Sequence, residues 1–176
     1  MFNFLKNGDE NGFSWDLIKN VEDGRENLGL LMPVLVYRLF HYTIKEEITK
    51  RYGKEASVDI FRNSGKLAGE EFARNMLNLN LSFSKFMAHL QSVLAENKIG
   101  ILRVEKLDLE TGELIITVGE DLECSGLPVI GEEVCNYDEG FLAGILKEYT
   151  KKEYTVVETD CWATGSRVCR FLATIK

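Results

Sequence analysis

The stretch that decides the fold is YTVVETDCWATG (154–165), followed after two residues by VCRFLATI (168–175). Two runs that contain valine, threonine and aromatic residues flank a turn around Gly165, which predicts a β-hairpin. In an antiparallel pair centred on Gly165, Cys161 and Cys169 lie opposite each other with their side chains on the same face. Two thiolates held together in this way are half of a zinc site.

A second hairpin is predicted upstream, where apolar residues recur with period two from Ile99 to Val118 around the turn Thr111-Gly112. Four helical segments complete the pattern. We expect the first from Pro33 to Gly53, the second from a cap at Ser57 to about Leu77, the third from a cap at Ser82 to about Asn97, and the fourth from Asn136 to Tyr149.

Two of these helices carry glycines four residues apart, Gly65 with Gly69 and Gly140 with Gly144. Each such glycine weakens a helix by roughly 1 kcal/mol, so we expect close packing against a neighbouring element. The order of helices, hairpin, helix and hairpin predicts an α+β fold, with helices packed on an antiparallel sheet made of two hairpins. We assign residues 27–176 to this single domain and residues 1–26 to an irregular lead-in.

The composition narrows the classes of function. The chain has 176 residues, of which 45% are hydrophobic, and this is enough for one globular domain with its own core. The net charge of −7 argues against nucleic-acid binding. No apolar run approaches a membrane span and the N-terminus lacks a secretory pattern, so we expect a cytoplasmic protein without membrane contact. Its cysteines are then expected to be thiols or metal ligands.

Cys135 directly precedes the predicted fourth helix, whose dipole favours a thiolate, and it can supply a third sulfur if that helix packs on the hairpin. Glu158 and Asp160 are both near enough to give a fourth ligand. In a regular strand Glu158 faces away from Cys161 unless the strand bulges. The alternative is a set of buried free cysteines. Cys124 is expected to be a plain thiol near the hairpin, with an alternative role as a ligand.

The segments 135–144, 156–165 and 168–171 carry the pattern C-x4-G-F-x-x-G, then E-x-x-C-x-x-x-G-x-x-x-C-x-F. This pattern resembles the 4-vinyl reductase domain family. The resemblance implies one structural Zn²⁺ ion held by four residues of these segments, and it favours Glu158 over Asp160. The implied ligands are Cys135, Glu158, Cys161 and Cys169. Four protein ligands close a tetrahedral site and leave no position for a substrate.

The resemblance also implies a fold like that of the TRAPP Golgi-tethering subunit and of NO-signalling ligand-binding domains, and a homodimer. It implies a sensor or carrier that binds an apolar or aromatic small molecule and acts with a separate regulatory protein. Two alternatives stay open, a protein-interaction adaptor and a 4-vinyl reductase-like subunit acting on a tetrapyrrole. Enzymatic activity is less favoured, because the chain has no GxGxxG loop to hold a reductant.

The predicted third helix supplies the candidate ligand pocket. Its apolar stripe can line a cavity, with a histidine beside it as a polar anchor. The alternative is that the stripe is core, as in most amphipathic helices, and that the histidine lies at the surface. The candidate residues are Phe83, Phe86, Met87, His89 and Leu90.

Overall fold

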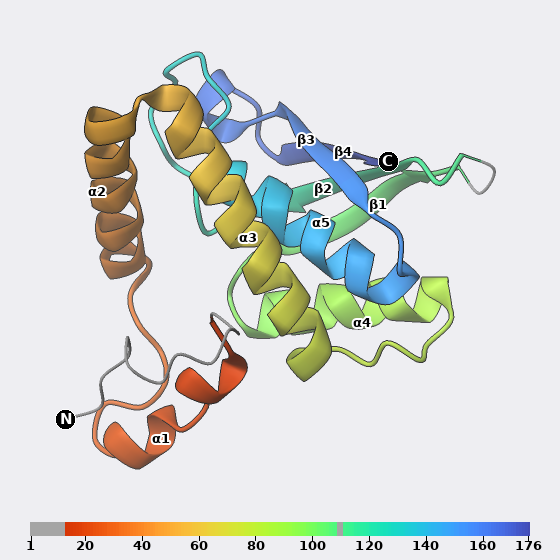
Figure 1. Ribbon diagram of the computed structural model, residues 1–176, viewed down its shortest axis with the longest axis horizontal. Helices are drawn as coiled ribbons and strands as arrows, with labels where there is room; N and C mark the ends of the chain where they lie inside the picture. Colours follow the sequence, from red (N-terminus) through yellow and green to blue (C-terminus); the bar gives the residue numbers. More distant parts are fainter. Residues whose placement is uncertain (1–12, 109–110) are drawn as a thin grey trace. The chain divides into compact units, whose positions relative to one another are not determined.

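The computed structural model describes residues 13–108 and 111–176, and the chain divides after Pro33 into two units (Figure 1). The described part of the first unit contains the 3-10 helix η1 (Trp15–Leu17) and the helix α1 (Val21–Gly24). Residues 1–12 of the predicted lead-in lie outside the described range. The second unit holds the other helices and the sheet. Within the described ranges, no helix is long and apolar enough to cross a bilayer.

Four helices of the second unit follow the predicted order. They are α2 (Val34–Tyr52), α3 (Lys54–Met76), α4 (Phe83–Glu96) and α5 (Asn136–Thr150). The predicted start of α3 is wrong, because Gly53 adopts φ 87° and turns the chain directly from α2 into α3. Ser57 is therefore buried inside α3 and does not cap it. Ser82 precedes α4 as its N-cap residue, as predicted.

The four strands form one antiparallel sheet in the order β1-β2-β4-β3. They are β1 (Ile101–Leu107), β2 (Leu114–Gly119), β3 (Tyr154–Asp160) and β4 (Cys169–Ile175). Both predicted hairpins are present, and the pairing of β2 with β4 joins them into one sheet. A register shift between Glu158 and Asp160 marks the bulge in β3 that lets the strand change the direction of its side chains.

Helix α5 lies between α3 and the sheet, and it is the central element of the second unit (Figure 1). The glycines let α3 and α5 approach until their backbones touch. A Cβ on Gly140 would lie 1.9 Å from the carbonyl oxygen of Arg62, and one on Gly69 would lie 2.1 Å from that of Phe141. The predicted close packing at these glycines is thus confirmed.

Helix α4 contacts β1, and α2 contacts α3 on the other side of the unit. Tyr149 of α5 links α4 to this core, since its ring stacks on Phe86 at a centroid distance of 3.9 Å. The Tyr149 hydroxyl donates a hydrogen bond to the carbonyl oxygen of Leu81 at 2.9 Å. The two ends of α5 are therefore fixed differently, with Cys135 at its start and an aromatic stack near its end.

Candidate metal centre

Four buried cysteines converge where three segments of the chain meet. Cys124 lies in the segment that follows β2, and Cys135 is the N-cap residue of α5. Cys161 follows β3 and is the N-cap residue of the 3-10 helix η2 (Trp162–Thr164), while Cys169 begins β4. The hairpin therefore holds two sulfur atoms, and the segment between β2 and α5 adds two more.

The donor atoms of this cysteine cluster fit a tetrahedral metal ion. All four Sγ atoms lie within 4.8 Å of one another. The Sγ of Cys135 is 3.8 Å from those of Cys161 and Cys169, and the Sγ of Cys124 is 3.0 Å from that of Cys169. Sulfur atoms about 2.3 Å from a central Zn²⁺ are about 3.8 Å apart. The cluster can therefore hold a metal ion of the kind that prefers thiolates.

Glu158 lies beside the cysteine cluster. Its Oε2 accepts a hydrogen bond from the backbone N–H of Cys135 at 3.1 Å, and its buried Oε1 has no hydrogen-bond partner. Among the described residues, the four sulfur atoms form a group of potential ligands without Glu158. The geometry thus favours Cys124 as the fourth ligand, and the assignment of Glu158 stays a prediction. Asp160 is paired with Arg170 instead.

The surroundings of Cys161 stabilise a thiolate. The backbone N–H of Thr164 donates to its sulfur, and hydrogen bonding with Cys124 is the largest effect that lowers the pKa of Cys161. The corresponding contact with Cys124 raises the pKa of Cys135. Burial, followed by the charge of Cys161, raises the pKa of Glu158 to about 8. A cation must displace thiol protons to bind here, so its affinity rises with pH.

Three polar side chains of α2 hold the segments that carry Cys124 and Cys135. The guanidinium of Arg38 donates to the carbonyl oxygen of Leu122 at 2.8 Å, and the Tyr42 hydroxyl donates to that of Glu123 at 3.2 Å. Lys45 Nζ donates to the carbonyl oxygen of Val134 at 2.7 Å. We call Arg38, Tyr42 and Lys45 the α2 clamp. The clamp is not among the residues predicted from the sequence, although positions i, i+4 and i+7 share one helix face.

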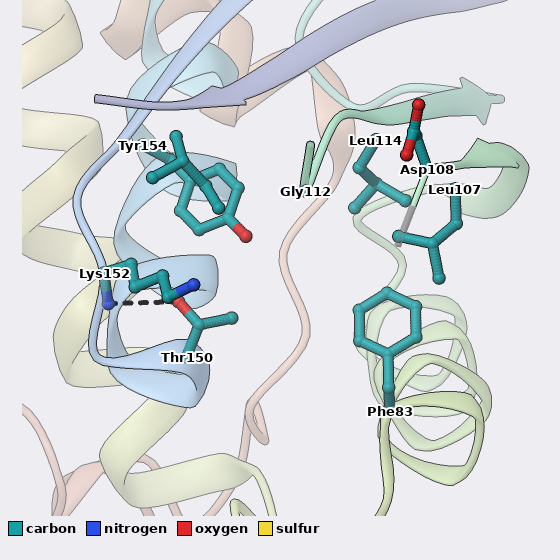
Figure 2. Close-up of a pocket in the computed structure, with 9 residues that line it drawn as sticks. Phe83, Leu107, Asp108, Gly112, Leu114, Thr150, Lys152 and Tyr154 are labelled. Carbon is teal, nitrogen blue, oxygen red and sulfur yellow. Dashed lines mark hydrogen bonds between the residues drawn. The ribbon is translucent and has the colours of Figure 1, made fainter. Parts of the chain in front are cut away.

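A separate pocket of about 200 Å³ opens between the start of α4, the end of α5 and the sheet (Figure 2). In Figure 2, Phe83 points toward Leu107 and Leu114, and the Tyr154 ring faces them from the opposite wall. The lining is mostly apolar, with a few polar groups at its rim. An apolar cavity of about 150 Å³ is large enough to bind benzene, so this space suits a small aromatic molecule.

One of the pocket residues predicted from the sequence, Phe83, lines this pocket. Phe86, Met87 and Leu90 are buried in the core, and His89 is half-buried at the side of α4. The tertiary contacts explain the difference, because α4 turns its apolar stripe toward β1 and α5 and leaves its first residue at the pocket. Their assignment as ligand-contacting residues stays a prediction.

The same fold occurs in several sensory and binding domains. The phenol-responsive sensory domain of the transcription activator PoxR, solved with phenol, superposes with a TM-score of 0.63 at 15% identity, over 84% of this chain and 76% of that one. A trafficking protein particle complex subunit 3 from Naegleria fowleri, covalently bound to palmitic acid, gives 0.62 at 12% identity, over 81% and 94%. The predicted fold class is thus confirmed.

Sequence comparison gives the family. The model of the 4-vinyl reductase domain matches residues 114–175. An uncharacterized protein of Methanocaldococcus jannaschii is 32% identical over 130 residues, which cover 68% of this chain and 78% of the relative. A vinyl-4-reductase family protein of the same organism superposes with a TM-score of 0.61 at 15% identity, over 94% of this chain and 99% of that one. The chain belongs to the 4-vinyl reductase domain family, as the sequence motifs predict.

Proposed function

We propose that this protein is a zinc-stabilised, cytoplasmic small-molecule-binding module that acts as a sensor or carrier. The observation that carries the proposal is the buried cluster of four cysteines, in a fold that solved sensory and binding domains share. The cluster fixes the start of α5 to the last hairpin. A metal ion there would hold the two faces of the domain together and leave the chemistry of binding to the pocket.

The proposed Zn²⁺ ligands are Cys124, Cys135, Cys161 and Cys169, with Glu158 as the competing fourth ligand. Native mass spectrometry with elemental analysis of the same sample tests this assignment. Cys124→Ser should lose zinc under mild chelation, whereas Glu158→Gln should retain it. Loss in Glu158→Gln with retention in Cys124→Ser would restore the ligand set that the motifs imply. Asp160→Asn is the matched acidic control, because its carboxylate pairs with Arg170 away from the cluster.

The proposed ligand is an apolar or aromatic molecule bound in the pocket of Figure 2. Two similarly folded proteins were solved with phenol and with palmitic acid, and both molecules are largely apolar. Extraction of the purified protein followed by mass spectrometry should detect a bound molecule of a few hundred daltons or less. Phe83→Ala should weaken its binding about tenfold or more, because the aromatic wall of the pocket is lost. Equal binding by Phe83→Ala would exclude this pocket.

A protein-interaction adaptor is the second candidate function. Helix α2 exposes a row of large apolar side chains on its outer face, including Leu35 at 78%, Leu39 at 65% and Phe40 at 68%. Exposed apolar patches of this kind mark interaction surfaces, and either a second copy of the chain or a regulatory protein would fit. Light scattering of the wild type and Phe40→Asp tests the predicted homodimer. A monomer in both samples would favour a different partner.

A further inference from the structure

Unpartnered buried polar atoms gather around the cysteine cluster. In the part of the chain that the structure describes, five buried side-chain atoms lack a hydrogen-bond partner, and they belong to four residues. Glu158 is bonded to the backbone of Cys135, Glu123 is adjacent to Cys124, and His41 Nε2 lies 3.0 Å from Glu123 Oε1. The fourth is Asp138, in the first turn of α5. Buried groups of this kind are costly unless something absent from the protein chain binds them.

One of these four residues, Asp138, belongs to a second group of potential metal ligands. Donor atoms of Asp121, Cys135 and Asp138 all lie within 4.8 Å of one another. Asp138 Oδ2 is one of the unpartnered atoms. Cys135 belongs both to this group and to the cysteine cluster, so its sulfur stands between two sets of donors. Thiolate is a soft ligand that favours Zn²⁺, and this sulfur can serve an ion on either side.

The backbone holds this second group in place independently of any ion. Asp121 Oδ1 accepts hydrogen bonds from the backbone N–H groups of Glu123 and Cys124, both at 2.9 Å, and this fixes the turn that carries Cys124. Asp138 is fixed by its place in the first turn of α5, three residues after Cys135. The two carboxylates are therefore brought together by two different segments, as the ligands of a built site are.

The charges around the site require a counter-ion. Asp121 is 3% exposed and Glu123 is 1% exposed, and burial followed by the charge of Glu123 raises the pKa of Asp121 to about 6. The nearby cations of the α2 clamp, Arg38 and Lys45, donate to backbone carbonyl groups. A Zn²⁺ ion bound by four thiolates carries a formal charge of about −2 and adds to the negative charge. A second divalent cation would offset it.

We infer that this protein has a second divalent-cation site formed by Asp121, Asp138 and the sulfur of Cys135, which bridges to the ion in the cysteine cluster. The mixed set of sulfur and carboxylate oxygen suits Zn²⁺ and disfavours Mg²⁺ and Ca²⁺, which prefer oxygen alone. The buried pair His41 and Glu123 lies beside the site and would orient its ligands through outer contacts. The inference rests on occupation of the cysteine cluster in the proposed function.

The test is the number of zinc ions per chain, measured on wild-type protein reconstituted with Zn²⁺ and desalted. Native mass spectrometry and elemental analysis should both give two zinc ions for the wild type and one for Asp138→Asn. Asp160→Asn, the matched control with an acidic residue paired to Arg170, should keep two. One zinc in the wild type overturns the second site and leaves the cysteine site standing. No zinc at all overturns the proposed function as well.

A titration of the metal-free wild type with Co²⁺ gives a second readout that needs no variant. Sulfur-to-cobalt absorption should rise with the first equivalent and change again with the second, because the second ion binds the shared sulfur of Cys135. A spectrum that stops changing at one equivalent contradicts the second site. This measurement holds even if Asp138→Asn does not fold.

Discussion

The α3–α5 interface and the cysteine cluster lie at the same helix, yet they are completed in different ways. At the interface, the backbones of α3 and α5 touch through Gly65, Gly69, Gly140 and Gly144, and no space remains for a side chain. At the cluster, buried oxygen and nitrogen atoms lack partners in the described residues. The first region is complete as a packing of protein atoms. The second requires a cation, so the two regions should respond oppositely to a chelator.

The largest expected effect is on the cluster. Removal of the metal by a chelator, or Cys161→Ser, should lower the free energy of unfolding by several kcal/mol, because the energy of a structural metal is folding energy. Urea unfolding of treated and untreated protein measures it. Cys161→Ser should be insensitive to the chelator, and Asp160→Asn should respond as the wild type does. Equal midpoints with and without chelator would remove the contrast between the two regions.

The next effect concerns the interface. A Cβ on Gly144 would lie 2.3 Å from the carbonyl oxygen of Lys66, so Gly144→Ala must push α3 and α5 apart. We expect a loss of about 3 kcal/mol or more in the free energy of unfolding, of the same size with and without chelator. Gly24→Ala in α1, where a Cβ meets nothing within 4 Å, is the control and should not destabilise. A chelator-dependent loss in Gly144→Ala would show that the regions are coupled.

A smaller effect is expected at the α2 clamp. Lys45→Met removes the hydrogen bond to the carbonyl oxygen of Val134, the residue before Cys135. We expect zinc to be released about 10- to 100-fold more readily, as when outer partners of metal sites are lost. Competition with a chromophoric chelator measures this. Lys50→Met is the control, because Lys50 pairs with Glu46 on the exposed side of α2. Release at the wild-type rate would assign the clamp to folding alone.

The smallest effect is expected at the edge of the α3–α5 interface. The hydrogen bond from Arg74 is the main cause that lowers the pKa of Glu148. This stabilisation is present above the unfolded pKa of a glutamate, about 4.3, and is lost as the pH falls through the lower folded value. Glu148→Gln should therefore cost about 1 kcal/mol or less at pH 7 and nothing at about pH 3. Urea unfolding at both pH values measures the difference, and a pH-independent cost would contradict it.

Local patterns in the sequence were sufficient for most of the fold. The period-two runs predicted both hairpins, and the helical runs predicted all four helices of the second unit. The start of α3 was wrong because a serine that can cap a helix also fits inside one, and the conformation of Gly53 decided between them. The glycine pairs predicted close packing but did not identify which helix would face which.

The sequence by itself determined that Cys135, Cys161 and Cys169 would be neighbours, since the hairpin and the start of α5 are local features. Only the tertiary structure decided that Cys124 joins them, because its segment is held by side chains of α2 more than 80 residues earlier in the chain. It also decided that Asp121 and Asp138 lie together. The physical reason is that periodicity reports which face a residue takes within one element, whereas contacts between distant segments depend on how the elements pack.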